Sequence, residues 1–255
     1  MPKLNKKVIV IFNPRSSNLT SIPILARSLC DAGYLPKVYE ENLADVRDEF
    51  PLPPINGDVD IYPWNQTVLF AHNLNFHPRP TLQSYSAYTP ELAELNAALL
   101  RSTQAVKNIL FDVDPIDNHF PSLDDGLSWL ELLTRYDIAG ATKSFVLLKH
   151  SATPRNYHLT LLEDRMIYFN RPVTLPVTNK DPIWAKIEIN DTLAGFMISK
   201  LYKPPILKMT VLLRDGRQMD FRLVSGMTRS GFILSPLILD KNDLSRWPPL
   251  MDCRL

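Results

Sequence analysis

The sequence predicts an α+β protein in which a small α/β unit is followed by an antiparallel β-sandwich. Strand-like and helix-like runs alternate between residues 50 and 143, which is typical of an α/β unit. From about residue 144, short β-rich runs follow one another without an intervening helix, which is typical of a sandwich. An Asp-Gly pair between two alternating runs indicates a β-hairpin in this second part.

The chain is long enough for one large domain or two small ones. Its 255 residues are 45% hydrophobic and 22% charged, which are ordinary values for a globular protein. Its 22 prolines and 8 glycines favour a rigid, β-rich body over a flexible hinge enzyme. We divide the chain into an N-terminal segment (1–49), the α/β unit (50–143), the sandwich (144–240) and a C-terminal tail (241–255).

The N-terminal segment has no clear repeat or motif. Lys6 to Phe12 is apolar enough for a short buried strand, and Ser21 to Gly33 is consistent with a helix that Gly33 ends. A second helix is expected from Asn42 to Phe50, where a run of prolines stops it.

The α/β unit contains three predicted strands and two predicted helices. Thr89 and Pro90 have the residue types of an N-cap and a first helical position, so Pro90 to Arg101 is expected to be a helix. The second helix is expected over Leu127 to Arg135, where leucines recur on one face. The strands are expected at Val59 to Pro63, Thr67 to His72 and Asn108 to Val113, the last buried on both faces.

The sandwich is predicted from six β-rich runs: SFVLLKH, YHLTLLE, IWAKIEI, ILKMTVLL, MDFRLV and GFILSPLI. Apolar and polar residues alternate from Leu207 to Leu213 and again from Met219 to Leu223. Asp215 and Gly216 lie between these two runs, so we expect the runs to pair antiparallel.

Charge and cysteine content limit the classes of partner. The formal net charge is +1 with both signs interspersed, which argues against a nucleic-acid partner. The apolar run after MPKLNKK is too short for an export signal, and no segment reaches the length of a membrane span.

Cys30 and Cys253 have no metal-ligand spacing. Idle thiols are the favoured interpretation, and a long-range disulfide is the alternative.

Asp112 and Asp114 are the residues that would carry a metal-dependent activity. An Asp-x-Asp pair at the end of a buried strand can place two carboxylates on one side, where Mg²⁺ or Mn²⁺ would polarise a leaving diphosphate. Strand ends are also rich in Asp for ordinary turn reasons. This reading is therefore the alternative: a divalent-metal-dependent glycosyl or phosphoryl transferase.

No other catalytic arrangement emerges. The five histidines are scattered, no Gly-x-Ser-x-Gly elbow is present, and eight dispersed glycines form no phosphate loop. We therefore predict that this chain on its own is not an enzyme.

Aromatic residues around a proline-framed loop are the better candidates for binding. Trp64, Arg79, Tyr85, Ser86 and Tyr88 combine rings that stack on sugars with polar groups that orient a ligand. The competing interpretation is a loop that buries its tyrosine rings for packing alone. We expect a rigid, largely packed loop, with Arg79 held by a carboxylate from residues 112–125.

Two phrases, PRP-x-x-QSYSAYTP and SGF-x-LSPL, carry a resemblance. Residues 57–240 resemble the extracytoplasmic C-terminal region of large, mostly uncharacterised bacterial multi-spanning membrane proteins whose membrane parts are glycosyltransferase-like. The resemblance implies a place on the periplasmic face of the inner membrane. It also implies a non-catalytic role, either binding a glycan or lipid-linked sugar or assembling with a membrane-protein partner.

Overall fold

The computed structural model describes residues 27–176, 178, 181–190, 195, 206–213 and 215–245. The predicted strand at residues 6–12 lies outside this range, as does Cys253; Cys30 is exposed. The class is α+β, as predicted, with one mixed sheet and two small antiparallel sheets.

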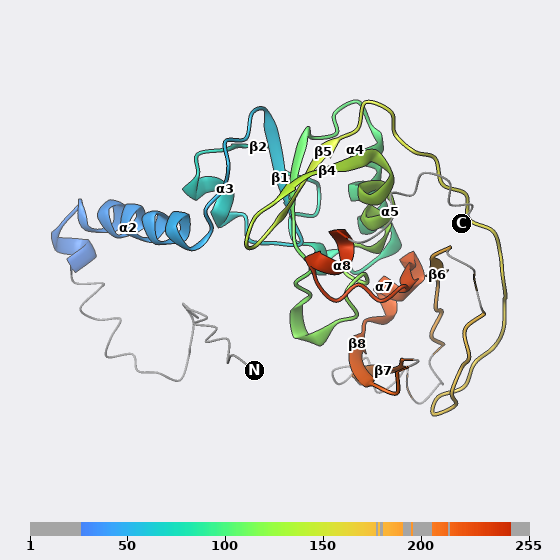
Figure 1. Cartoon of the computed structure of the whole chain (residues 1–255). Helices are drawn as coiled ribbons and strands as arrows, with labels where there is room; N and C mark the ends of the chain where they lie inside the picture. The colour runs from blue at the N-terminus through green and yellow to red at the C-terminus, as the bar shows by residue number, and fades with distance from the viewer. Residues whose placement is uncertain are drawn as a thin grey trace.

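A five-stranded sheet of order β2-β1-β3-β5-β4 forms the centre of the protein (Figure 1). β1 is parallel to both β2 and β3, whereas β5 is antiparallel to β3 and to β4. Its strands are β1 (Asp58–Tyr62), β2 (Asn75–Phe76), β3 (Asn108–Phe111), β4 (Tyr136–Ala141) and β5 (Val146–His150). Every residue of β3 is buried, as its apolar run predicted.

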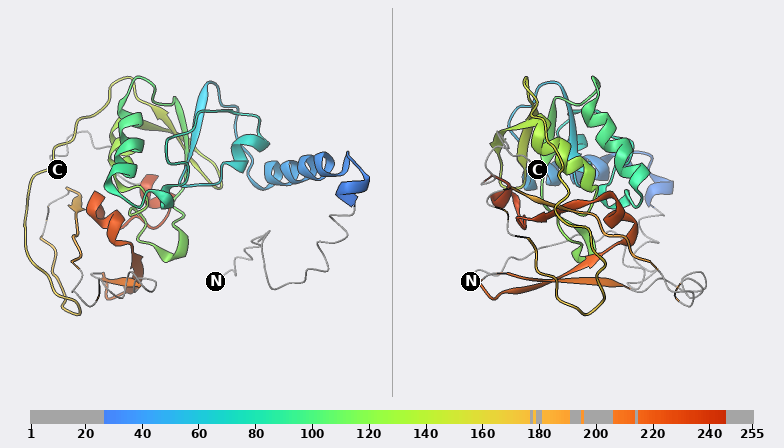
Figure 2. Two further views of the ribbon diagram at one scale, coloured as in Figure 1. Left: turned by 180° about the vertical axis from the view of Figure 1, so that it is seen from behind. Right: turned by 90° about the vertical axis from the view of Figure 1, so that its right-hand side faces the viewer.

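Helices pack on both faces of this sheet, although the helix over residues 34–49 extends outward from it (Figures 1 and 2). α4 (Pro90–Arg101) and α5 (Gly126–Arg135) pack on one face and contribute Leu100, Trp129 and Leu132 to the largest core. α2 (Tyr34–Glu49) and α3 (Thr67–Ala71) lie toward the other face, where Val68 and Leu69 join a second core. The predicted N-cap is confirmed, since the Thr89 hydroxyl accepts a hydrogen bond from Leu92 N.

One prediction in this part is wrong, and a second is correct as a helix but has the wrong start. Residues 67–72 were expected to be a strand, but α3 occupies them, because periodicity cannot distinguish a five-residue apolar run in a strand from one in a short helix. The helix expected from Asn42 begins earlier, at Tyr34, directly after Gly33.

In the second predicted unit (144–240), the described residues form several small elements, and these do not make up a β-sandwich. β7 (Leu207–Leu212) and β8 (Gln218–Leu223) pair antiparallel in full register, which confirms the predicted hairpin. β6 (Ile183–Ala185) pairs antiparallel with β9 (Phe232–Ser235). Residues 157–163, predicted to be a strand, have no regular secondary structure. The described residues of this part also form two short helices, α7 (Ser225–Ser230) and α8 (Lys241–Ser245).

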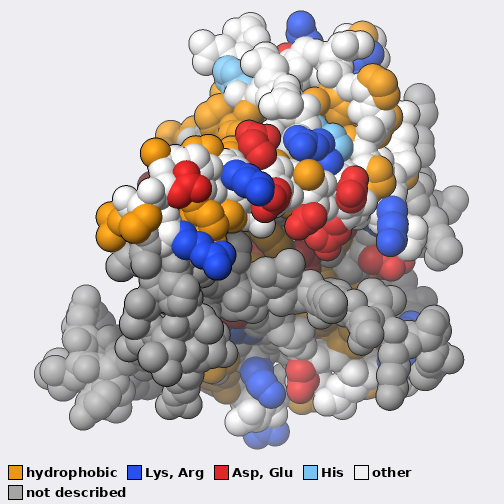
Figure 3. All heavy atoms as spheres, turned by 90° about the vertical axis from the view of Figure 1, so that its left-hand side faces the viewer, with side chains coloured by type: hydrophobic (Ala, Val, Ile, Leu, Met, Phe, Trp, Pro, Cys, Tyr) orange, Lys and Arg blue, Asp and Glu red, His pale blue; other side chains and the backbone are white. Residues whose placement is uncertain are grey.

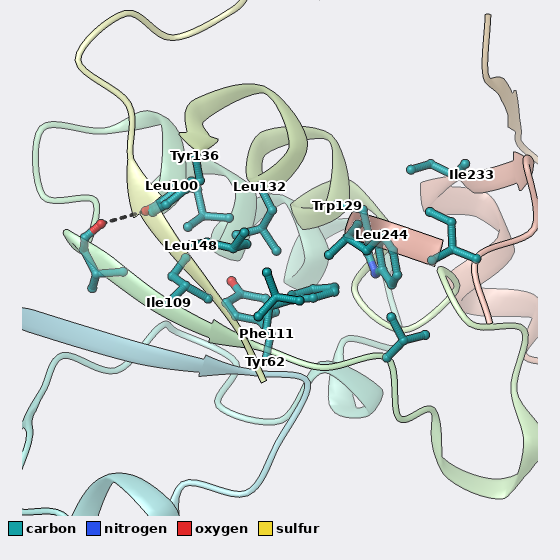
Figure 4. Packing of buried hydrophobic residues seen from close by; sticks show 14 residues of the cluster. Tyr62, Leu100, Ile109, Phe111, Trp129, Leu132, Tyr136, Leu148, Ile233 and Leu244 are labelled. Carbon is teal, nitrogen blue, oxygen red and sulfur yellow. Dashed lines mark hydrogen bonds between the residues drawn. The ribbon is translucent and has the colours of Figure 1, made fainter. Parts of the chain in front are cut away.

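The predicted boundary at residues 143/144 divides the hairpin formed by β4 and β5. β5, assigned to the sandwich from the sequence, belongs to the central sheet because it pairs with β3. C-terminal side chains also enter the main core: Ile233 and Leu244 lie beside Trp129 (Figure 4). The two predicted units therefore share the main core through these C-terminal side chains, whereas β7, β8 and α7 pack with Phe120 and Leu123 in a third cluster.

Two glycines allow the C-terminal elements to approach the α/β part closely. A Cβ on Gly226 of α7 would lie 2.0 Å from Tyr88 O, and a Cβ on Gly126 of α5 would lie 2.0 Å from Gly231 O. Neither position has room for a side chain. The backbone of α7 thus rests directly on the loop that precedes α4.

Candidate functional site

The aromatic candidates gather around the carboxyl end of β1 and the loop that precedes α4. Trp64 follows β1, and its indole N–H donates to Asp114 O (3.2 Å). Tyr85 and Ser86 belong to a 3-10 turn, η1 (Ser84–Ser86), and Tyr88 follows it. Ser84 N–H donates to Pro63 O (2.9 Å), which holds the turn against the segment that carries Trp64. We call Trp64, Tyr85, Ser86 and Tyr88 the aromatic lip.

The lip residues differ in exposure. Tyr88 is 49% exposed, whereas Trp64, Tyr85 and Ser86 are half-buried. Burial raises the pKa of the Tyr85 hydroxyl, and the neighbouring Tyr88 adds to that rise. The two tyrosines are therefore close enough to interact, and each leaves part of its ring accessible to solvent.

Arg79 lies beneath the lip rather than on it, which corrects its assignment as a ligand-contacting residue. Its side chain is 1% exposed and forms an ion pair with Asp60 Oδ2 (2.9 Å). It also donates to Ile61 O (2.6 Å), Pro63 O (2.8 Å), Thr81 O (3.0 Å) and Ser84 Oγ (3.2 Å). Its Cζ lies 3.7 Å from the centre of the Tyr62 ring. All the N–H donors of the guanidinium are thus used inside the protein.

The partner of Arg79 also differs from the prediction. A carboxylate from residues 112–125 was expected, but the direct partner is Asp60, in the middle of β1. Asp125 acts on Arg79 only through its charge. Burial raises the pKa of Asp60, although the Arg79 charge opposes that rise.

Asn96 holds the other side of the loop, and nothing in the sequence analysis singled it out. Its amide pairs with the backbone of Thr81, accepting from N–H (2.8 Å) and donating to C=O (3.1 Å). It also donates to Asp125 Oδ2 (2.8 Å), which accepts from Ser128 Oγ as well (2.8 Å). A polar residue on the buried face of an amphipathic helix is the signal that could have revealed it.

Asp125 is a fully buried carboxylate with an unusual titration. Burial raises its pKa to about 7, against the lowering effects of Arg79, Asn96 and Ser128. Its Oδ1 has no partner among the described residues. Its backbone is left-handed (φ 56°), a conformation that Asp tolerates better than most residues.

The predicted metal residues line a small hollow at the carboxyl ends of β1 and β3. Asp112, Asp114 and Asp124 line it together with Pro63 and Trp129. Asp124 is buried and paired with His119 Nδ1 (2.7 Å), but its Oδ2 has no partner in the described part of the chain. The described residues contain no group of three or more His, Cys, Asp or Glu placed to hold a metal ion.

A larger hollow of about 630 Å³ opens at the opposite ends of β1 and β3. Basic, amide and apolar residues line it, among them Lys107, Lys149, His150, Asn108 and Leu147. None of the aromatic lip residues lines this hollow, so it is separate from the candidate site.

Charge on the face that includes α2 is mixed. Acidic and basic side chains lie side by side across the described upper part of this face (Figure 3). Such interspersion produces no concentrated field of one sign there. Within the described residues, no helix has both the length and the apolar character needed to cross a bilayer.

Comparisons with known proteins give this chain no relative. No protein-family model matches it, and neither a curated protein nor a solved structure matches it.

Proposed function

We propose that this chain is a non-catalytic binding domain that takes a carbohydrate, free or lipid-linked, at the aromatic lip. The observation that carries the proposal is the accessible Tyr88 and partly accessible Tyr85 on a turn whose base is fixed by the buried Arg79. By resemblance, we place this binding on the periplasmic face of a bacterial inner membrane.

The rigid base favours binding because the lip loses little conformational entropy when a ligand arrives. Arg79 and Asn96 hold the loop from below and from the side, so the tyrosines are presented in a fixed arrangement. Aromatic faces pack against the C–H surface of a sugar ring, and hydroxyl groups such as that of Ser86 orient it.

The test is carbohydrate binding by the wild-type chain and by Tyr85→Ala and Tyr88→Ala, using a glycan panel and lipid-linked sugars. We expect the wild type to bind and each variant to lose affinity about tenfold or more, with an unchanged melting temperature. Tyr39→Ala is the matched control, because Tyr39 is 54% exposed on α2, away from the lip. Absence of wild-type binding, or variants that lose only stability, would show that the loop serves packing alone.

Assembly with a membrane-protein partner is the other use of the same lip. It predicts that Tyr88→Ala weakens co-purification with that protein while no sugar on the panel binds the wild type.

A divalent-metal transferase remains the second candidate. It is favoured by Asp124 Oδ2, which has no partner among the residues that the structure describes and lies beside Asp112 and Asp114. Hard cations bind carboxylate oxygens of this kind. Calorimetric titration with Mn²⁺ or Mg²⁺ tests it. Stoichiometric binding that is lost in Asp112→Asn would support the transferase, and no heat of binding would remove it.

A further inference from the structure

A long apolar segment between β5 and β6 stands away from the rest of the protein. Residues 156–176, which we call the arm, have no helix or strand and run along the outside of the molecule (Figures 1 and 2). Nine large apolar side chains of the arm are exposed: Leu159, Leu161, Leu162, Met166, Ile167, Tyr168, Phe169, Val173 and Leu175. Exposed apolar surface of this extent on one segment marks an interaction site.

The start of the arm is firmly attached. Just before it, Arg155 donates to Asp137 Oδ1 (2.5 Å), Tyr136 O (2.6 Å) and Leu133 O (3.0 Å). Within the arm, the Tyr157 hydroxyl donates to the buried Glu131 (3.1 Å). The arm therefore begins from a fixed point on α5 and β4.

The far end of the arm is a tight, convex turn. Asn170 has a left-handed backbone (φ 60°), and Arg171 N–H donates to Tyr168 O (3.3 Å). This turn and the two residues before it present four consecutive apolar residues, of which Met166, Phe169 and Tyr168 are 79%, 72% and 69% exposed. We call residues 166–169 the apolar tip.

The apolar tip lies at the end of the molecule that the β7–β8 hairpin occupies, in all three views (Figures 1 and 2). The hairpin itself exposes Leu212, 72% accessible, and Ile206, which precedes β7, is 71% accessible. This end of the molecule is thus apolar on two separate segments.

We infer that the apolar tip inserts into the interfacial layer of a lipid bilayer. A tight turn at the end of the arm offers no groove to a folded partner, whereas a fluid interface needs no complementary shape. Phe and Tyr are residue types that favour the boundary between headgroups and acyl chains. Arg165 and Arg171 flank the tip. Arg165 pairs with Glu163 (3.0 Å) and donates to Thr174 O (2.9 Å), so Arg171 is the cation that we expect to reach a lipid phosphate while its stem stays apolar. At this shallow depth the backbone of the turn keeps its contact with water.

The test is co-sedimentation of the full chain with vesicles of phosphatidylcholine alone and of phosphatidylcholine with phosphatidylglycerol. We expect binding to both, stronger to the anionic vesicles, and at least about a tenfold loss of binding in the double variant Ile167→Asp/Phe169→Asp. The matched control is Leu35→Asp/Tyr39→Asp, which makes the same change at two exposed positions on α2 (55% and 54%) and is expected to bind as the wild type does.

Three results would overturn the inference: wild type that stays in solution with both vesicles, tip and control variants that bind alike, or a dimer that only the tip variant loses. The last would assign the tip to a second copy of the chain. A supporting measurement is Phe169→Trp, whose added fluorescence should shift to the blue with vesicles and be quenched by brominated lipid. Tyr88→Ala should bind vesicles normally, so this experiment and the carbohydrate experiment fail independently.

Discussion

At the residue scale, the candidate site rests on charges that are inside the protein rather than on its surface. Arg79 and Asp60 are a buried pair, and removing one partner of such a pair leaves an uncompensated charge in a poorly solvated place. The accessible residues of the lip are uncharged. The buried Arg79–Asp60 pair therefore makes the site rigid, and the uncharged residues of the lip provide the contacts to a ligand.

Asp125→Asn tests how this buried polar group depends on pH. The folded-state pKa of Asp125 is raised from 3.8 to about 7, so protonation favours the folded state. Its stabilising contribution is fully present below about pH 4 and is lost as pH rises through 7. Asn is neutral throughout and can accept the same two hydrogen bonds. The free energy of unfolding of the variant, relative to wild type, should therefore rise by about 2–3 kcal/mol between pH 5 and pH 8.

The measurement is urea denaturation of both proteins at several pH values. Ser128→Ala leaves the carboxylate in place but removes a hydrogen bond that lowers the pKa of Asp125, so its pH dependence should keep the sign of the wild type and extend to higher pH. Parallel curves for wild type and Asp125→Asn would contradict a raised pKa at this residue.

The sequence predicts only part of this site, because some of its residues carry no local signal. The aromatic candidates are close together along the chain, and the structure places them near one another. Asp60, Asn96 and Asp125 come from β1, α4 and the start of α5. Asp60 and Asn96 are single polar residues among apolar neighbours, and Asp125 belongs to an Asp-Asp pair that is ordinary at the start of a helix. Only the tertiary contacts reveal that they form one network.

At the scale of the elements, local signals were sufficient where a pattern was long or capped. The N-cap at Thr89, the buried run of β3 and the Asp-Gly turn each predicted an element that the structure contains. The run at 157–163 has strand-like composition but no described partner strand, and a strand requires one to satisfy its backbone. β5 was correct as a strand and wrong in its sheet, because composition does not specify the neighbour.

Gly226→Ala tests the close approach between α7 and the loop before α4. The new Cβ would lie 2.0 Å from Tyr88 O, so one of the two segments must move. We expect a loss of about 1–3 kcal/mol in the free energy of unfolding, as for other overpacked contacts. Chemical denaturation followed by circular dichroism provides the measurement.

The matched control is Gly140→Ala, where an added Cβ meets nothing within 4 Å. This variant should be as stable as wild type, or slightly more stable. Equal stability of Gly226→Ala and Gly140→Ala would show that α7 does not pack on this loop.

At the scale of the whole molecule, the shared core matters more than the predicted domain boundary. Ile233, Ile238 and Leu244 are buried in the same cluster as Phe111 and Trp129 (Figure 4). The C-terminal elements therefore complete the core of the central sheet. We expect this part of the chain to unfold together with the sheet, in one cooperative transition.

Limited trypsin digestion tests whether the parts of the protein before and after the arm are held together by packing as well as by the polypeptide chain. Arg165 lies in the exposed arm and is followed by Met166, so internal cleavage should occur first after Arg165, whereas trypsin does not cleave the bond between Arg171 and Pro172. Because the residues after the arm are packed into the shared core, the two halves should stay together on a native size-exclusion column. They should separate in denaturant, and separation under native conditions would contradict the shared core.

The contact between Gly226 and Tyr88 also couples two equilibria: ligand binding at the aromatic lip and the docking of α7 on the loop before α4. Tyr88 carries an accessible ring on one side and, through its carbonyl, supports α7 on the other. A ligand that restrains Tyr88 must strengthen the docking of α7 by the same factor as that docking strengthens the ligand's affinity. A change that loosens α7 would then lower the affinity for a ligand that α7 does not contact.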